Sequence, residues 1–483
     1  MSAAAVVSCL PPPPTDAAAG AWVCPFCPLL CEAPDRQVPD CPRARQRLAS
    51  LAQPGANSAA GPSINGQPAS LADALAAAVR LLRASRQPLF GGLGTDVSGA
   101  RALQRLADAT GAISDSAQGA ALSESLRTLQ DRGGYSTTLA ELRSRADLVV
   151  CLGGVFASAA PLLFERHVLP ARNAWMPGAN GPRQVVVLGS TAGQDAPDAA
   201  LLARLATEPG ITLQTIPWHG DAHSTVALLC ALLAALGRGA VLPITPSVPP
   251  APPTPPAASA PPAPPAPPAP PALLALAHAL RAAHYSVIIG APAQLPAQGA
   301  LLMEAAHRCV ERLNAHTRAA ALWLGGGEGG ATTNQVFTWL TGLPLRSRAG
   351  PAGLEHQPVI FDANRLLADG AVDLLMWLSC FDADLLPPPS ACPRIVLGSP
   401  ALGAALAGQA AAGAAPSHTV FLPVATPGVQ TDGDLFRTDG AVLLPLRPLL
   451  PSLQPPNNPA DLPTLPGLLA QLGEALRSAE VAP

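Results

Sequence analysis

The sequence predicts an α/β protein with two doubly wound lobes and a small cysteine-rich segment near its N-terminus. Short apolar runs that end in glycine alternate with amphipathic stretches of helix length, on both sides of a Pro/Ala-rich segment. Such runs, followed by small or polar residues, are typical of the carboxyl ends of buried parallel strands. Four cysteines within 18 residues precede this α/β pattern and predict a metal or redox segment beside it.

The predicted strands are distributed over both halves of the chain. They cover residues 88–93, 148–153 and 185–189 before the Pro/Ala-rich segment, and 286–290, 320–325, 374–379 and 395–398 after it. Residues 71–84 and 300–314 have the pattern of crossover helices. Thr138 and Glu141 form a capping-box pattern, in which the hydroxyl accepts from a first-turn amide and the carboxylate bonds back. We expect that helix to run through Arg145.

These elements predict five segments. Residues 1–70 form the cysteine segment, 71–242 a first α/β lobe, and 272–400 a second α/β lobe. Residues 401–483 complete the body. Between the lobes, more than half of residues 243–271 are proline, so we expect polyproline II or disorder there, as a linker or insert.

Composition narrows the function classes. Hydrophobic residues make up 49% of the 483 residues and charged residues only 13%, which favours a subunit whose surface is covered by partners. The net charge of −3 gives no reason to expect nucleic acid as a partner. All 29 basic residues are arginine, so Schiff-base chemistry and a lysine-bearing phosphate loop are excluded.

Three features bear on the cellular location. The N-terminus lacks the positive charge of a secretory signal, and the most apolar stretch, residues 226–236, is too short to span a membrane. The cysteines are clustered rather than spread as in a secreted disulfide scaffold. We therefore expect a cytoplasmic protein with no membrane contact.

The candidate metal ligands are Cys24, Cys27, Cys31 and Cys41, with spacings of two, three and nine residues between them. The first three thiols can converge from one tight loop, and Cys41 can close a tetrahedron from the next segment. A bound iron–sulfur cluster, a zinc ion, and a degenerate site that binds nothing are all compatible with this spacing.

Four blocks of sequence carry a family resemblance. Residues 22–32, with the pattern Trp-Val-Cys-Pro-Phe-Cys-Pro-Leu-Leu-Cys-Glu, resemble the iron–sulfur loop in the B subunit of formylmethanofuran dehydrogenase, a molybdopterin oxidoreductase. Residues 129–141, 331–342 and 421–440 resemble later blocks of the same family, in the same order. The resemblance implies a molybdopterin-oxidoreductase-like fold and, at the four cysteines, a 4Fe–4S cluster that is either present or vestigial.

The departures from the family pattern concern the cofactors. Where the redox enzymes carry a cysteine or selenocysteine metal ligand, this chain has Ala121, and Ser123 or Ser125 would be the only nearby substitutes. The loop before Cys41 is shorter than in the redox enzymes. After Gly440 too few residues remain for the family's final β-barrel, so we expect no C-terminal β-barrel. Molybdopterin with Mo or W is therefore not expected, and no catalytic or cofactor-binding residue is assigned.

This pattern is similar to that of the B subunit in the bacterial formyltransferase/hydrolase complex of tetrahydromethanopterin-linked one-carbon metabolism, which oxidises formaldehyde. The resemblance implies a non-redox, structural role beside three partners: a formyltransferase subunit, an amidohydrolase-like A subunit, and a C subunit. The alternative is a redox-active molybdenum or tungsten formylmethanofuran dehydrogenase subunit. A third possibility is an electron-transfer module that keeps only the cluster.

Overall fold

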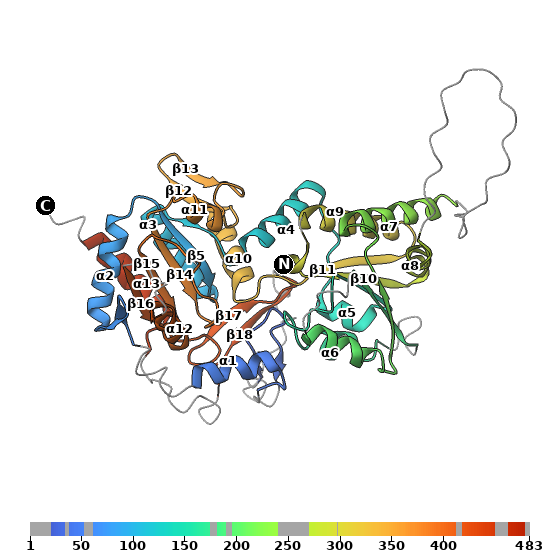
Figure 1. Ribbon diagram of the computed structural model, residues 1–483, viewed down its shortest axis with the longest axis horizontal. Helices are drawn as coiled ribbons and strands as arrows, with labels where there is room; N and C mark the ends of the chain where they lie inside the picture. Colours follow the sequence, from blue (N-terminus) through green and yellow to red (C-terminus); the bar gives the residue numbers. More distant parts are fainter. Residues whose placement is uncertain are drawn as a thin grey trace, which may run out of the picture. The chain divides into compact units, whose positions relative to one another are not determined.

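The computed structural model describes residues 21–33, 38–52, 61–173, 181–189, 196–239, 270–296, 298–411, 418–449 and 462–478. Within these residues the chain is a mixed α/β protein (Figure 1). It divides into two compact units, each built from separate stretches of sequence. Unit 1 comprises residues 1–117, 328–435 and 443–483, and unit 2 comprises residues 118–327 and 436–442.

Unit 1 is built on one large sheet. Its strands β6, β5, β14, β15 and β16 run parallel in that order, and the antiparallel strands β12 and β13 extend one edge while β3 and β4 extend the other. Their bounds are β3 Ser63–Ile64, β4 Gln67–Pro68, β5 Pro88–Gly94, β6 Ile113–Ser114, β12 Ser347–Gly350, β13 Gly353–His356, β14 Leu374–Ser379, β15 Arg394–Gly398 and β16 Thr419–Pro423.

Helices and two small antiparallel pairs complete unit 1. The helices α2 and α3 begin at side-chain caps: Ser70 accepts from the amide of Asp73, and Asp96 from that of Gly99. The C-terminal helix α13 packs against both. The bounds are α1 Pro42–Ala52, α2 Leu71–Ala84, α3 Val97–Thr110, α10 Gly330–Thr341, α11 Ala363–Ala368, α12 Pro400–Ala411 and α13 Leu465–Ser478, with β1 Trp22–Val23 paired to β2 Glu32–Ala33 and β17 Gly433–Phe436 to β18 Leu443–Leu446.

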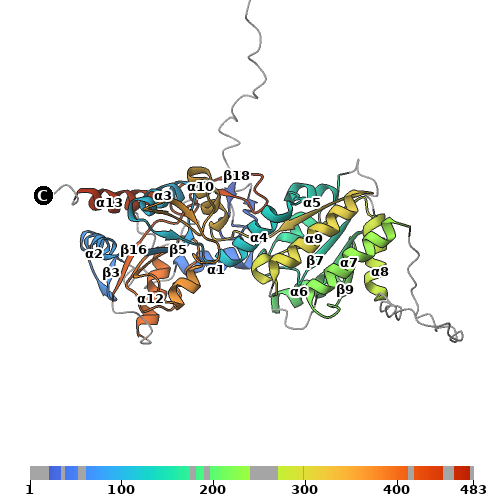
Figure 2. The ribbon, with the colours of Figure 1, turned by 90° about the horizontal axis from the view of Figure 1, so that it is seen from above.

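Unit 2 has an entirely parallel sheet in the order β11, β10, β7, β8, β9. Helices α7 and α9 lie on one face of this sheet, and α5 and α6 lie on the other (Figures 1 and 2). The bounds are β7 Leu148–Leu152, β8 Arg183–Leu188, β9 Ile211–Ile216, β10 Tyr285–Gly290, β11 Arg318–Trp323, α4 Gly119–Arg132, α5 Leu139–Arg145, α6 Ala196–Leu205, α7 Ala222–Gly237, α8 Pro271–Ala282 and α9 Gly299–Asn314, with a π-turn at Phe164–Val168 and a 3-10 turn at Pro292–Gln294.

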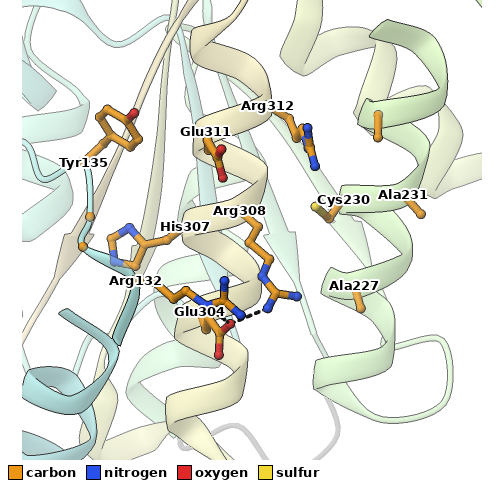
Figure 3. Close-up of a pocket in the computed structure, with 13 residues that line it drawn as sticks. Arg132, Tyr135, Ala227, Cys230, Ala231, Glu304, His307, Arg308, Glu311 and Arg312 are labelled. Atoms are coloured by element: carbon orange, nitrogen blue, oxygen red, sulfur yellow. Dashed lines mark hydrogen bonds and ion pairs between the residues drawn. The ribbon is translucent and has the colours of Figure 1, made fainter. Parts of the chain in front are cut away.

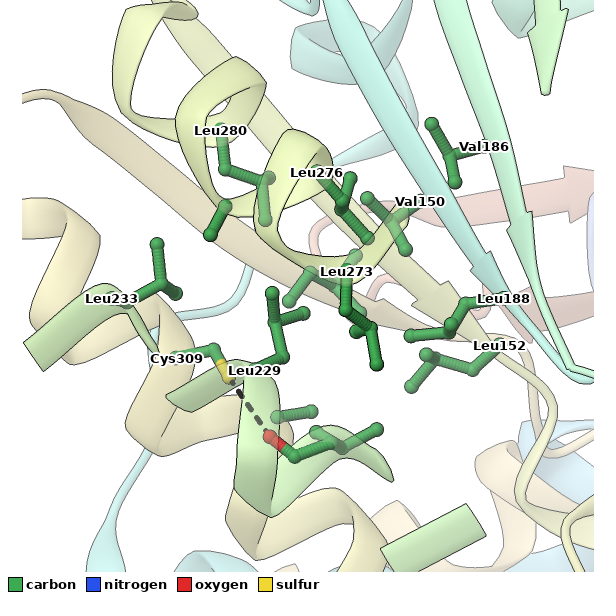
Figure 4. Close-up of a cluster of buried hydrophobic side chains, with 14 of the residues drawn as sticks. Val150, Leu152, Val186, Leu188, Leu229, Leu233, Leu273, Leu276, Leu280 and Cys309 are labelled. Carbon is green, nitrogen blue, oxygen red and sulfur yellow. Dashed lines mark hydrogen bonds between the residues drawn. The ribbon is translucent and has the colours of Figure 1, made fainter. Parts of the chain in front are cut away.

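The core of unit 2 joins one face of its sheet to three helices (Figure 4). Val150 of β7 and Val186 of β8 pack with Leu229 of α7, Leu273 of α8 and Cys309 of α9. Central strands such as β7 are buried along their whole length, as expected for a parallel sheet covered on both faces. The short apolar runs of the sequence therefore correspond to buried strands.

Every predicted strand is present, with ends that differ by a few residues, and the helix predicted at residues 71–84 has those bounds. The Thr138 cap is confirmed, since its hydroxyl accepts from the amide of Glu141 at 3.1 Å. The expected return bond is not formed. The Glu141 carboxylate instead accepts from the hydroxyls of Thr137 at 3.1 Å and of Tyr285, in β10, at 3.3 Å.

The compact units do not follow the predicted sequential lobes at residues 71–242 and 272–400. Strand β5, from the first predicted lobe, pairs with β14 from the second, and β7 pairs with β10 in the same way. Hydrophobic periodicity identifies buried strands but carries no information on which strands pair. Residues 240–269, which include most of the Pro/Ala-rich segment predicted at 243–271, lie outside the described residues. No helix described here is long and apolar enough to cross a membrane.

Candidate functional site

The candidate site is the cysteine loop of unit 1, residues 24–31, with Cys41 just before α1. The strands β1 and β2 hold the two ends of the loop together, and the Cys24 amide donates to the Cys31 carbonyl at 3.0 Å. The Leu30 amide closes a tight turn on the Cys27 carbonyl at 3.2 Å. All four thiol side chains, those of Cys24, Cys27, Cys31 and Cys41, are buried.

Burial and mutual repulsion favour the protonated forms of Cys24 and Cys27. Burial raises the pKa of Cys24 well above its usual value, and neighbouring thiols raise it further. Burial and the nearby Cys31 raise the pKa of Cys27 to about 12, although the guanidinium of Arg43 acts in the opposite direction. Because a metal ligand must be a thiolate, binding would have to release protons from this loop.

The cysteines supply the donor chemistry of an iron–sulfur or zinc site. Within the ranges that the structure describes, however, no three His, Cys, Asp or Glu side chains are placed so that they could hold a metal ion.

The loop is anchored next to the carboxyl end of the parallel sheet. The indole Nε1 of Trp22 donates to the carbonyl of Gly428 at 2.6 Å, and Gly428 follows the last parallel strand, β16. The segments after these strands bond to one another, since Cys380, which follows β14, donates from its amide to Gly94 at the end of β5 at 2.9 Å. In open α/β sheets this edge is the usual place for a ligand.

Ion pairs occupy this edge. Arg43 of α1 pairs with Glu328 at 2.5 Å and donates through Nε to the carbonyl of Phe26 in the cysteine loop at 2.6 Å. One turn later on α1, the guanidinium of Arg47 pairs with Asp382 and, at 2.7 Å, with Asp384 in the segment after β14. The charges that face the strand ends are therefore compensated inside the protein.

Glu328 carries the clearest electrostatic perturbation of the site. Burial raises the pKa of its carboxyl to about 7, and this effect outweighs the opposing attraction of Arg43. The carboxylate of Asp382 acts in the same direction as burial. One oxygen of Glu328, Oε2, is buried without a hydrogen-bond partner, which explains why the charged form is disfavoured.

The backbone around Glu328 lies directly on the end of strand β5. A Cβ atom added to Gly329, which has a φ of +75°, would lie 2.3 Å from the carbonyl oxygen of Thr95. A Cβ added to Gly94 would lie 2.7 Å from the Glu328 carbonyl oxygen. No side chain fits between these segments, so the glycines are required by the close approach of two backbones. The end of β5 is covered by the chain itself.

Ala121, which the family pattern aligns with the metal ligand, lies in the first turns of α4 in unit 2. Its carbonyl accepts from the hydroxyl of Ser125 at 2.9 Å, so that hydroxyl bonds within its own helix and also contacts the sulfur of Met303 at 3.6 Å. A methyl group offers no metal donor, and Ser125 is committed to its helix.

Sequence reasoning missed the charged residues of this site. Arg43, Arg47, Glu328 and Asp382 were not singled out, although the first two share one face of a helix directly after Cys41. Their spacing of four residues was the signal in the sequence that could have identified them. Their acidic partners lie 285 and 335 residues further along the chain and have no recognisable motif.

The structure thus defines a mixed α/β protein whose cysteine loop lies at the carboxyl edge of a mostly parallel sheet. No family model matches the sequence. The chain is a homologue of the B subunit of the formyltransferase/hydrolase complex Fhc from Methylorubrum extorquens. The two are 27% identical over 414 residues, which cover 86% of this chain and 97% of the relative.

A comparison of structures leads to the same complex. The chain resembles a chain in the crystal structure of the formyltransferase/hydrolase complex FhcABCD from Methylorubrum extorquens, determined with methylofuran. The TM-score is 0.65 at 26% identity, and the match covers 87% of this chain and all of the other. The family resemblance deduced from the sequence is confirmed.

Proposed function

We propose that this chain is the B subunit of a formyltransferase/hydrolase complex in which it serves a structural, non-redox role. The observation that carries the proposal is the similarity from end to end, which covers 97% of the B subunit from Methylorubrum extorquens and the whole of its structural counterpart. A relative that matches over its full length is expected to occupy the same place in an assembly.

The site supports the non-redox part of this proposal. The strand ends of unit 1 are covered by the backbone of Gly329 and by the ion pairs of Arg43 and Arg47. A molybdopterin would have to displace these groups and separate the buried ion pairs, and a buried charge left without its partner costs about 3–5 kcal/mol. Ala121 offers no ligand to molybdenum or tungsten. We propose that the cysteine loop is likewise vestigial and serves to hold β1 and β2 against unit 1.

The finer parts of the assignment follow from the same homology. We propose that the fold is of the molybdopterin-oxidoreductase type, with units 1 and 2 corresponding to its two α/β lobes. The partners would be a formyltransferase subunit, an amidohydrolase-like A subunit, and a C subunit, in the cytoplasm and in one-carbon metabolism linked to tetrahydromethanopterin. The partners, and not this chain, would perform formyl transfer and hydrolysis.

The test is a comparison of complexes purified with and without this chain. We expect it to copurify with the three partner subunits, and formyl transfer to fall when it is omitted because the complex comes apart. Metal analysis of the native complex, purified under anaerobic conditions, should find no molybdenum or tungsten. Stoichiometric amounts of either metal, with reduction of viologen dyes by a formylated carrier, would instead support the redox-active alternative.

A further inference from the structure

A groove of about 750 Å³ in unit 2 contains a cysteine that the proposed function does not use. The groove lies over helices α7 and α9 and the end of α4 (Figure 3). Cys230 of α7 lines it together with charged residues of α9, namely Glu304, Arg308, Glu311 and Arg312. A cysteine beside arginines at an accessible surface has the surroundings of a reactive thiol.

The guanidiniums of α9 face Cys230. Its side chain is half-buried and points from α7 toward α9, where Arg308 and Arg312 are four residues apart and therefore share one helix face (Figure 3). A hydrogen bond with Cys309 and the charges of Arg312 and Arg308 lower the pKa of Cys230 to about 7, although burial opposes them. These interactions favour the thiolate form of Cys230.

Other charged groups also surround the groove. Glu304 pairs with Arg132 at 2.9 Å and also with Arg308, so its charge is compensated. Glu311 lines the groove as well. Helix α8, which packs against α7 from another side, carries the exposed His278 and the half-buried Arg281.

Cys309 provides a second thiol next to Cys230. It is fully buried, and its sulfur donates to the carbonyl of Val226 at 3.7 Å (Figure 4). Val226 lies one turn before Cys230 on α7, so the Cys309 sulfur reaches the part of α7 from which Cys230 projects. The hydrogen bond with Cys230, together with burial, raises the pKa of Cys309 well above its usual value, which favours its protonated form.

We propose that Cys230 and Cys309 form a peroxide-sensitive thiol pair that links helices α7 and α9 by a disulfide. The Cys230 thiolate attacks one oxygen of hydrogen peroxide, the O–O bond breaks, and hydroxide leaves, giving a sulfenic acid. The Cys309 thiol then attacks that sulfur. Its proton and the sulfenic hydroxyl leave as water, so two thiols are oxidised by two electrons while one peroxide is reduced to two waters.

The inference rests on unit 2 alone and is independent of the proposed function. The test treats the full-length chain with one equivalent of hydrogen peroxide and follows its peptides by mass spectrometry. We expect a Cys230–Cys309 crosslink two hydrogens lighter than the free peptides. Cys392, also half-buried but bonded to the Ser390 hydroxyl at 3.4 Å, is the internal control and should stay reduced.

Three variants separate the roles of the two thiols and of the neighbouring arginine. Cys230→Ser should abolish the crosslink, and Cys309→Ala should stop Cys230 at a sulfenic acid that dimedone traps. Arg312→Gln should slow alkylation of Cys230 by iodoacetamide at pH 7 by about threefold, because the thiolate fraction falls. The matched control is Arg318→Gln, at an exposed position of β11.

Two results would overturn the inference: Cys230 passing directly to sulfinic acid in the unmodified chain, or Cys230 and Cys392 being alkylated at the same rate at pH 7. Thermal unfolding of each variant shows whether it is folded. If Cys309→Ala fails to fold, the crosslink in the unmodified chain and the rate for Arg312→Gln still decide the question.

Discussion

The guanidinium of Arg43 and the carboxylate of Glu328 form an ion pair at 2.5 Å, with only 24% and 10% of the two side chains exposed. They are 285 residues apart in the sequence. The pair connects the helix that follows Cys41 to the turn that covers the end of β5. It therefore links the cysteine segment to the sheet of unit 1, at the edge where open α/β sheets usually bind their ligands.

Arg43→Gln should destabilise the protein by about 2–3 kcal/mol, because it leaves the Glu328 carboxylate buried without its charged partner. The measurement is urea unfolding at pH 8, where Glu328 is ionised. Arg45→Gln is the matched control. It lies two residues away on the same helix, and its ion pair with Asp40 has side chains 64% and 88% exposed. We expect a change below about 0.5 kcal/mol there, and equal losses in the two variants would contradict the prediction.

Glu328 should also give the protein a distinct pH dependence. Because burial raises the pKa of its carboxyl to about 7, the folded chain holds a proton that the unfolded chain has already released between pH about 4.3 and about 7. The contribution to stability is fully present below that window and is lost as the pH rises through it. The free energy of unfolding of Glu328→Gln, measured relative to that of the parent, should therefore be higher at pH 8 than at pH 5. Glu474→Gln, at an exposed position of α13, should show no such difference.

Individual helices and strands could be predicted well from the sequence, but the pairing of the strands could not. Buried parallel strands are continuous apolar runs, so β14 was predicted with its observed bounds, Leu374–Ser379. The cap at Thr138 was predicted because its contacts are local. The pairing of β5 with β14 depends on tertiary packing, which leaves no mark in either segment. The same holds for the site: the cysteine spacing is visible in the sequence, whereas the charges that cover the strand ends come from distant segments.

Besides the bond from Arg43 to Phe26, the hydrogen bond between Trp22 and Gly428 should hold the cysteine loop in place. Trp22 is completely buried, so Trp22→Phe leaves the Gly428 carbonyl without its donor and should cost about 2 kcal/mol in denaturant unfolding. Trp339→Phe is the control, since that side chain is 58% exposed, and it should change stability by less than about 0.5 kcal/mol. A loss for Trp22→Phe as small as for the control would show that the loop does not depend on this bond.

The Pro/Ala-rich segment should be dispensable for folding. Helices α7 and α8 pack against each other in the core of unit 2, on either side of this segment, and residues 240–269 lie outside the described residues. Deletion of residues 249–268 should therefore leave the melting temperature within about 2 °C of the parent, because a sequence so rich in proline and poor in large apolar residues is expected to bury little surface. The control deletes residues 271–276 of α8, which removes buried leucines and should prevent folding. A large loss of stability for the first deletion would assign this segment a packing role.

The cysteine loop provides the test of whether a redox function survives. Cys24→Ser and Cys27→Ser together should leave formyl transfer and hydrolysis by the assembled complex unchanged, because burial favours the protonated form of both thiols and no described group of side chains is placed to hold a metal. Because both positions are buried, some stability will be lost, and copurification with the partner subunits must be verified first. The control is Cys151→Ser, at a buried position of β7 in unit 2. If the double variant stayed assembled, lost turnover and lost bound iron, while Cys151→Ser kept its activity, the loop would carry a working cluster and the structural role would have to be abandoned.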